Sequence, residues 1–322
     1  MAGDSTLRVV AGVLNEPGGR VLIAQRPAGK HLAGGWEFPG GKRAPGERRE
    51  AALAREFMEE LGVEVLDARP LIRYAHDYPE RRVELDVWHI LEHRGEPRGL
   101  EGQALDWCAP ADLLAHDLLP ADKPIVTALT LPDLCLVTGE FTGPDDFARR
   151  LAGALAAGAG LVQIRLPGAA PARLIEVGEI AAPLCRAGGA TLVVNSAIDD
   201  WPTLDQTGLF DGLHVSAREA ASARGRPVAA GRWLGVSCHD AAELAIAARL
   251  QADYLFLGTV ATSASHPGRT PLGLEAFARL VEPVRLPVYA IGGLAADDRA
   301  ASWSAGAQGI AAIGALWSQG SR

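Results

Sequence analysis

The chain has 322 residues, of which 48% are hydrophobic and 22% charged, so it is long enough for two folded domains of ordinary composition. It contains no run of about 18 apolar residues that could form a transmembrane helix, and its first residues lack the pattern of a signal peptide. The net charge of −8 argues against nucleic-acid binding, which needs basic patches. We therefore expect a cytoplasmic protein that binds neither membranes nor nucleic-acid polymers.

The cysteines of the chain are widely spaced, at Cys108, Cys135, Cys185 and Cys238. This spacing suits neither a zinc site nor a disulfide framework. We expect all of them to behave as small hydrophobic residues in a reducing compartment. The sequence leaves the oligomeric state open.

The first part of the chain combines strand-like runs with one strong helix. Leu7–Leu14 and Val21–Ala24 are short apolar runs joined through a Glu-Pro-Gly-Gly turn, and both are predicted to be strands. Residues 83–87 alternate between apolar and acidic side chains, which is the period of a half-buried strand. Residues 120–131 are predicted to form a closing helix.

Residues 41–63 combine a turn, a helix and a terminating glycine. Glu47 follows the Pro45-Gly46 turn and is predicted to begin the helix, where its charge suits the positive end of the helix dipole. Gly62 is predicted to end the helix. Four apolar residues fall on one helical face and should pack inward: Ala52, Leu53, Phe57 and Leu61.

Another face of the same helix carries Glu56, Glu59 and Glu60, spaced i, i+3 and i+4. Like charges so close together destabilise a helix unless a cation neutralises them. Carboxylate oxygens on this spacing suit Mg²⁺ or Mn²⁺, which also grip substrate phosphates. Taken alone, such a helix more often presents a solvated acidic face.

The full segment resembles the Nudix signature, G-x5-E-x7-R-E-U-x-E-E-x-G-U, at every specified position. The resemblance implies an α/β/α sandwich that hydrolyses nucleoside diphosphate derivatives with Mg²⁺, which neutralises charge and activates a water. It makes Glu56, Glu59 and Glu60 catalytic metal ligands. It also implies that Arg55 orients these glutamates and that Glu47 supports them or binds a further metal.

The flanking segments are similar to the mutator-type (MutT-like) branch of the Nudix family, which removes 8-oxo-dGTP from the nucleotide pool. The matching segments are residues 24–27, 35–42, 102–107 and 119–124. Carried over by position, the Gly40 carbonyl and the Glu101 carboxylate would bind metal, and Glu101 would also be catalytic. The residues expected to bind the nucleotide are Arg26, His31, Phe38 and Asp122.

Asp122 departs from this branch, whose best-known bacterial members carry Asn at the same place. An amide both donates and accepts hydrogen bonds, whereas a carboxylate only accepts unless it is protonated. Asp122 can still hold the N–H edge of a guanine-type base, and its alternative role is a helix N-cap. Phe38 has core packing as its alternative. The resemblance predicts an 8-oxo-dGTP diphosphatase that releases 8-oxo-dGMP and pyrophosphate, which would serve DNA replication and repair.

The second part of the chain alternates short apolar strands with helical stretches rich in Ala and Leu. Eight such strands predict a parallel (β/α)8 TIM barrel and place the domains at 1–131 and 132–322. The predicted strands are Leu134–Thr138, Gly160–Arg165, Thr191–Asn195, Gly212–Val215, Leu234–Ser237, Tyr254–Gly258, Val288–Ile291 and Gly309–Ile313.

Residues 134–317 resemble the thiamine-phosphate synthase and thiazole tautomerase family. The matching pieces are residues 162–165, 195, 212–215, 235–239, 253–258, 290–293 and 305–310. Where the family's charged groups are expected, this chain has Pro167, Ser196 and His266. Losing such groups weakens transition-state stabilisation, so we expect no ordinary synthase activity.

What persists in the barrel is a set of residues suited to a phosphorylated thiazole-like ligand. Barrels commonly bind phosphate through the loops after strands 7 and 8, and either of two histidines could serve as an acid or base. The candidate residues are Arg165, Asn195, His239, His266, Gly292, Gly293 and Gly314. Three alternatives remain: glycines kept only for tight turns, a Nudix domain acting on a thiamine-related pyrophosphate, and a barrel serving as a phosphate-ligand sensor or scaffold.

Overall fold

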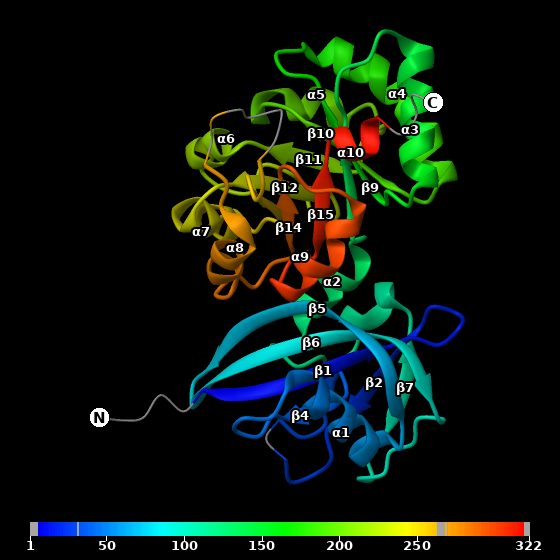
Figure 1. Cartoon of the computed structure of the whole chain (residues 1–322), viewed down its shortest axis with the longest axis vertical. Helices are drawn as coiled ribbons and strands as arrows, with labels where there is room; N and C mark the ends of the chain where they lie inside the picture. Colours follow the sequence, from blue (N-terminus) through cyan, green and yellow to red (C-terminus); the bar gives the residue numbers. More distant parts are fainter. Residues whose placement is uncertain (1–5, 31, 263–267, 269, 319–322) are drawn as a thin grey trace. The chain divides into compact units, whose positions relative to one another are not determined.

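The computed structural model describes residues 6–30, 32–262, 268 and 270–318 (Figure 1). The chain divides into two compact units, Met1–Thr130 with Glu282–Arg285, and Leu131–Val281 with Leu286–Arg322. The domain limits at residues 131 and 132 stay a prediction.

The first unit is built on a sheet with the strand order β4-β1-β6-β5 and a smaller sheet with the order β3-β2-β7. Strand β1 pairs in parallel with β6, whereas β5 and β6 form a long antiparallel hairpin. The predicted strands at residues 7–14 and 21–24 and in residues 83–87 are confirmed. The strands are β1 (Leu7–Leu14), β2 (Val21–Gln25), β3 (Trp36–Glu37), β4 (Gly40–Lys42), β5 (Glu64–Tyr78), β6 (Arg81–Arg94) and β7 (Leu105–Cys108).

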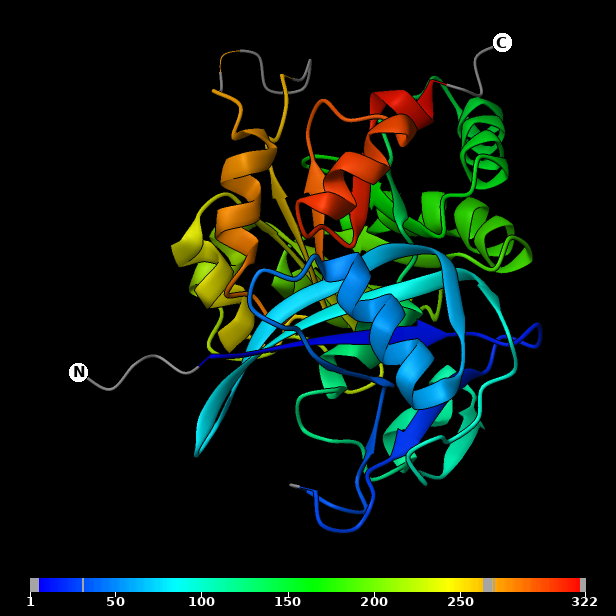
Figure 2. The same cartoon turned by 60° about the horizontal axis from the view of Figure 1, so that its bottom comes forward.

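Two helices cover opposite faces of the larger sheet. Helix α1 (Arg49–Leu61) packs with Val10 of β1, whereas α2 (Lys123–Thr130) packs with Ala11, together with the short helix η1 (Pro110–Ala115). Adjacent residues of a strand face opposite sides, which explains this division. Figure 2 shows α1 lying across the strands. The unit is the predicted α/β/α sandwich.

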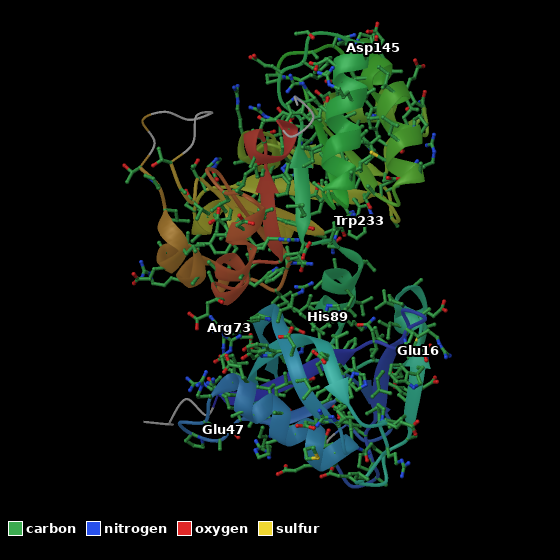
Figure 3. The ribbon with its side chains drawn as sticks, turned by 45° about the vertical axis from the view of Figure 1, so that its right-hand side comes forward. Glu16, Glu47, Arg73, His89, Asp145 and Trp233 are labelled. Atoms are coloured by element: carbon green, nitrogen blue, oxygen red, sulfur yellow. The ribbon has the colours of Figure 1, made fainter. Side chains whose placement is uncertain are left out.

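Helix α1 begins later than the sequence predicted. Its N-cap is Arg48, so the prediction that Glu47 begins the helix is wrong, and Glu47 lies in the preceding turn (Figure 3). The Glu47 carboxylate is held there by hydrogen bonds from the Ala44 N–H at 2.8 Å and from Arg55. Gly62 ends the helix with a φ of 68°, which confirms the predicted left-handed cap.

The second unit is a closed barrel of parallel strands in the order β8 to β15, as predicted. The strands are β8 (Leu134–Val137), β9 (Leu161–Arg165), β10 (Thr191–Asn195), β11 (Gly212–Val215), β12 (Trp233–Cys238), β13 (Tyr254–Gly258), β14 (Val288–Ile291) and β15 (Gly309–Ala312). The helices around them are α3 (Pro144–Ala156), α4 (Pro171–Ala187), α5 (Trp201–Asp205), α6 (Ala217–Ser222), α7 (Ala241–Arg249), α8 (Gly273–Val281), α9 (Arg299–Ser304) and α10 (Gly314–Trp317), with short turns η2 (Ile198–Asp200) and η3 (Ala296–Asp298).

The cysteines agree with the prediction that they act as small hydrophobic residues. Cys108, Cys135, Cys185 and Cys238 are all buried and free. Within the described residues, no helix is both long and apolar enough to cross a bilayer.

Candidate functional site

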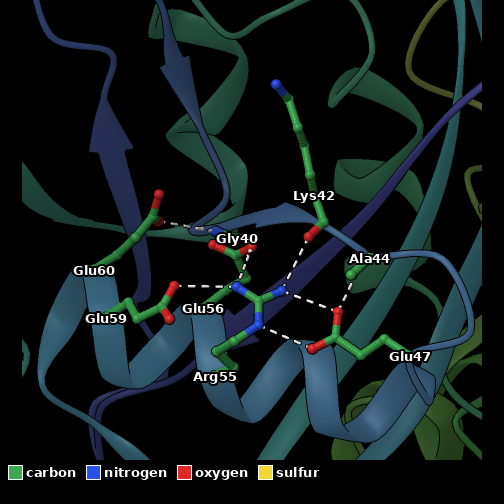
Figure 4. Close-up of polar contacts among 8 residues, drawn as sticks. All are labelled: Gly40, Lys42, Ala44, Glu47, Arg55, Glu56, Glu59 and Glu60. Atoms are coloured by element: carbon green, nitrogen blue, oxygen red, sulfur yellow. Dashed lines mark hydrogen bonds and ion pairs between the residues drawn. The ribbon is translucent and has the colours of Figure 1, made fainter.

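The guanidinium of Arg55 holds three of the carboxylates predicted from the sequence. It donates to Glu56 Oε1 at 2.8 Å, to Glu59 Oε2 at 3.1 Å and to Glu47 Oε1 at 2.9 Å (Figure 4). It also donates to the Lys42 carbonyl at 3.0 Å. The hydrogen bonds from Arg55 lower the pKa of Glu47 to about 2, and the carboxylates raise the pKa of Arg55. Arg55 thus ties the turn before α1 to the acidic face of the helix.

Two glycines of β4 let its backbone approach these carboxylates. A Cβ on Gly41 would lie 2.2 Å from Glu56 Oε2, and Glu56 is only 9% exposed. Gly40 donates its N–H to Glu60 Oε2 at 3.3 Å. Its φ is 151°, and a Cβ placed there would lie 2.1 Å from the Val10 carbonyl oxygen. Neither position has room for a side chain as the structure stands.

Glu60 lies in a small acidic cavity beside the end of α1. Burial, with the charges of Glu101 and Glu56, raises the pKa of Glu60 to about 7. A carboxyl group with such a pKa can exchange a proton near neutral pH. The cavity is lined by Ala24, Gln25, Pro27, Lys30, Glu37, Pro39, Glu60, Glu101 and Gln103. The fold thus brings Glu60 and Glu101, far apart in the sequence, to one cavity.

The loop that carries Glu101 is anchored to the C-terminal end of α1. The Leu100 N–H and Gln103 Nε2 each donate to the Glu60 carbonyl at 3.0 Å. The Glu101 N–H donates to Gln103 Oε1 at 2.8 Å. These bonds use a carbonyl group that the helix end leaves without an intrahelical partner. On the other side of the cavity, Lys30 Nζ contacts Glu101 Oε2 at 2.6 Å.

The residues expected to bind the nucleotide have different surroundings. Arg26 Nε donates to Glu37 Oε1 at 2.8 Å. Phe38 is 3% exposed and packs in the core, so it has a structural role, and its nucleotide contact stays a prediction. Asp122 is 4% exposed, and its pKa is raised well above the usual range by burial and by the charge of Glu37. His31 lies outside the described residues.

The donor set of this site fits a hard divalent cation. Carboxylate oxygens of Glu56, Glu59, Glu60 and Glu101, with the Gly40 carbonyl, are the ligands that Mg²⁺ and Mn²⁺ prefer. Among the described residues, no three His, Cys, Asp or Glu side chains are gathered closely enough to hold a metal ion. The ion pairs made by Arg55 and Lys30 engage three of the four carboxylates. Metal binding would therefore require carboxylates to exchange partners.

Three residues of interest were missed from the sequence. Lys30 and Glu37 line the acidic cavity, but nothing in their spacing pointed to it. Gln163 of β9 is 2% exposed, and within the described residues its Nε2 has no hydrogen-bond partner. Its position two residues before Arg165 on the same strand was the available signal, because residues i and i+2 share a face.

The barrel candidates that the structure describes lie at or just after the carboxyl ends of strands. Asn195 of β10 is in register with Arg165 of β9 and with His214 of β11. His239 follows β12, and its Nδ1 contacts Glu243 Oε2 at 2.8 Å. His266 lies outside the described residues.

The glycines after β14 have a packing explanation. A Cβ on Gly292 would lie 2.4 Å from the Thr259 side chain, and one on Gly293 would lie 2.3 Å from the Thr262 carbonyl oxygen. Both residues also have positive φ. Gly314, in contrast, begins α10 with nothing within 4 Å of a Cβ placed there. The first two glycines are therefore accounted for without a ligand, and their phosphate role stays a prediction.

The barrel interior contains a buried histidine, which predicts a pH-dependent stability. His214 contacts Tyr254 Oη at 3.2 Å and Ser237 Oγ at 2.9 Å, and burial lowers its pKa to about 3. In the unfolded chain the imidazole takes up a proton below about pH 6.5, whereas the folded state stays neutral. The stabilisation is therefore complete above pH 6.5 and is lost as the pH falls, by about 2 kcal/mol at pH 5.

The matched variant is His214→Gln, which removes the titrating group. The measurement is urea unfolding of the full chain at pH 7 and pH 5, followed through the barrel transition. Between these pH values, the free energy of unfolding should fall by about 2 kcal/mol more in the wild type than in His214→Gln. An equal loss in the two proteins would show that His214 does not stay neutral in the folded barrel.

Known proteins match each half of the chain. A family model described as thiamine monophosphate synthase matches residues 134–316, and one described as NUDIX domain matches residues 9–128. The CTP pyrophosphohydrolase of Escherichia coli (strain K12) is 40% identical over 122 residues, covering 38% of this chain and 90% of that protein. The 8-oxo-dGTP diphosphatase of the same organism is 33% identical over 123 residues, covering 38% and 95%.

For the barrel, the thiamine-phosphate synthase of Laribacter hongkongensis is 35% identical over 187 residues, covering 58% of this chain and 83% of that protein. The matches to the two halves do not overlap, and each falls on one of the folds described above. The chain therefore belongs to the thiamine monophosphate synthase family through its barrel, and it carries a MutT-like Nudix hydrolase domain in front of that barrel.

Proposed function

We propose that the Nudix domain is an Mg²⁺-dependent 8-oxo-dGTP diphosphatase. The observation that carries its hydrolase chemistry is the meeting of Glu60 of α1 with Glu101 at one cavity, next to the Glu56 carboxylate that Arg55 holds on the same helix. Glu56, Glu59, Glu60 and Glu101 would hold the metal, with the Gly40 carbonyl as a further ligand. The bound ion would neutralise phosphate charge and activate a water.

Two groups of the chain prepare the site for this chemistry. Arg55 holds Glu56 and Glu59 through charge-assisted hydrogen bonds, and the Glu56 carboxylate lies against Gly41 of β4. Glu60 lines the cavity and would accept the proton of the attacking water. Its pKa of about 7 belongs to the metal-free site, where burial and the charges of Glu101 and Glu56 raise it.

We assign the recognition of the substrate's nucleobase to Asp122. Burial raises the pKa of Asp122 well above its usual range, and a carboxyl group that is protonated both donates and accepts, as the amide of Asn does. Such a group can pair with the O6 and N7–H edge of an oxidised guanine, and ordinary guanine lacks this N–H. It can equally pair with N3 and the amino group of cytosine. The relative named CTP pyrophosphohydrolase therefore makes CTP the second candidate substrate.

Steady-state kinetics of the full chain with 8-oxo-dGTP, dGTP and CTP discriminate between these substrates. We expect kcat/KM for 8-oxo-dGTP to exceed that for dGTP by at least about 100-fold, since a site that pairs with the extra N–H rejects a base lacking it. Equal efficiency on 8-oxo-dGTP and dGTP would contradict the proposal. A preference for CTP would make CTP, rather than 8-oxo-dGTP, the assigned substrate. Hydrolysis of ADP-ribose or thiamine pyrophosphate in preference to 8-oxo-dGTP, dGTP and CTP would exclude both 8-oxo-dGTP and CTP as the assigned substrate.

For the barrel we propose a binding site for a phosphorylated thiazole-like ligand without ordinary synthase activity. Within the part of the chain that the structure describes, Gln163 Nε2 has no hydrogen-bond partner, which supports ligand binding because buried polar groups normally have partners. The lost charges support the second part: Pro167, Ser196 and His266 stand where the family's charged groups are expected, and the Ser196 hydroxyl donates to Asp200 at 3.0 Å.

Thermal unfolding with thiazole phosphate or thiamine phosphate is the test. A rise in melting temperature together with no thiamine phosphate formed from HMP pyrophosphate supports a ligand-sensing or degenerate barrel. Product formation would instead establish synthase activity, as in the relative of that name. The absence of any shift would favour a scaffold role.

A further inference from the structure

The acidic cavity of the Nudix domain contains one feature that the metal-ligand set does not explain. Lys30 Nζ lies 2.6 Å from Glu101 Oε2, and the two side chains are 49% and 45% exposed. Among the described residues that line the cavity, Lys30 is the one with a positive charge. Its charge is surrounded by Glu101, Glu60 and Glu37, which all raise its pKa, so it is protonated at neutral pH.

Hydrogen bonds around the loop that carries Lys30 place this residue beside the acidic cavity. The loop between β2 and β3 is closed at its base by Arg26 and Gly35, whose N–H and carbonyl groups are 2.9 Å apart. Gln25 Nε2 braces the loop by donating to the Gly34 carbonyl at 2.9 Å. A turn from Pro27 to Lys30 then directs the lysine toward the cavity. The loop carrying Glu101 is fixed to α1 on the opposite side, so the ion pair links two anchored loops.

We infer that Lys30 exchanges partners during the reaction: it neutralises Glu101 in the free protein and binds a substrate phosphate when Glu101 turns to the metal. This inference rests on the proposed metal-dependent hydrolysis. The Lys30 ammonium group and a divalent ion compete for the Glu101 carboxylate. Lys30 therefore weakens metal binding while no nucleotide is present. Once metal holds Glu101, a lysine without a partner attracts an anion, and the polyphosphate supplies one.

The two roles predict opposite effects of one substitution, Lys30→Met. A nearby lysine repels a divalent ion, and Coulomb's law in water-like surroundings gives about a fivefold effect on affinity. Mn²⁺ should therefore bind the variant about fivefold more tightly in the absence of nucleotide. The KM for the nucleotide should rise at least about tenfold through the lost charge-assisted hydrogen bond, with kcat nearly unchanged. Lys30→Arg keeps the charge and should restore both values.

The experiment titrates the full chain with Mn²⁺ alone, followed by the electron paramagnetic resonance of free Mn²⁺, and then measures KM and kcat. Arg94→Met is the matched control. Arg94, on β6, forms an exposed ion pair with Glu64 at 2.9 Å, so the substitution also removes one cation from an ion pair. The control should leave Mn²⁺ affinity and KM unchanged. Circular dichroism establishes that Lys30→Met is folded, as expected for a half-exposed loop residue.

Tighter Mn²⁺ binding with a raised KM in Lys30→Met supports the exchange. Unchanged or weaker Mn²⁺ binding, with a wild type that binds Mn²⁺ and hydrolyses nucleotide, overturns it and leaves the proposed function intact. A wild type that binds no Mn²⁺ overturns the proposed function and this inference with it.

Discussion

Replacing Glu56 by Gln is expected to lower kcat for nucleotide hydrolysis by about 10³-fold, the usual cost of removing one group that stabilises charge in a transition state. The side chain is buried, receives a hydrogen bond from Arg55 at 2.8 Å and lies against Gly41. Gln keeps its shape but loses the negative charge that a metal needs. Stopped assays of pyrophosphate release, with Mg²⁺ in excess, measure the effect.

The matched control for Glu56→Gln is Glu50→Gln in the first turn of the same helix. Glu50 is exposed and makes a long contact with Arg48 at 3.8 Å, which contributes little. We expect Glu50→Gln to retain wild-type kcat. A similar loss in both variants would mean that the helix, rather than the Glu56 carboxylate, had been damaged.

Replacing Gly41 by Ala is expected to lower kcat by about 10²-fold, since displacing a reacting group by about 1 Å has this cost. The new methyl group would lie 2.2 Å from Glu56 Oε2, so the carboxylate has to move. The obstructing atom is the end of a flexible side chain, so the fold should survive. Activity and melting temperature, measured together, separate these two effects.

Gly18→Ala is the control for this substitution, because a Cβ on the exposed Gly18 would approach only the Glu16 side chain, at 3.3 Å. It should keep full activity. Wild-type activity in Gly41→Ala would contradict the position assigned to Glu56, because the substitution cannot leave that carboxylate in place.

The sequence predicted the parts of the fold that depend on local pattern. The barrel strands were found within one or two residues, because each is a short apolar run bounded by turn residues. The end of α1 was found because Gly62 adopts the left-handed conformation that glycine favours. Its start was misplaced because a hydrogen bond from Arg55, eight residues away, holds Glu47 outside the helix.

The rest of the site depends on contacts between distant segments. Strands β3, β4 and β7 are short and were not predicted, because pairing with β2 and β1 rather than local pattern defines them. Lys30 contacts Glu101, which is 71 residues away in the sequence, and the spacing of residues within one helix or strand cannot predict such a contact. Asp122 was recognised by position, but the rise in its pKa follows from burial, which only the fold supplies.

The central claim is that the acidic face of α1 cuts a nucleotide diphosphate bond with the help of a divalent metal. Phosphorus NMR of 8-oxo-dGTP incubated with the full chain tests it most directly. We expect 8-oxo-dGMP and pyrophosphate in the presence of Mg²⁺, and no products after chelation or with Glu56→Gln. Hydrolysis that persists without divalent metal, or that is unaffected by Glu56→Gln, would contradict it.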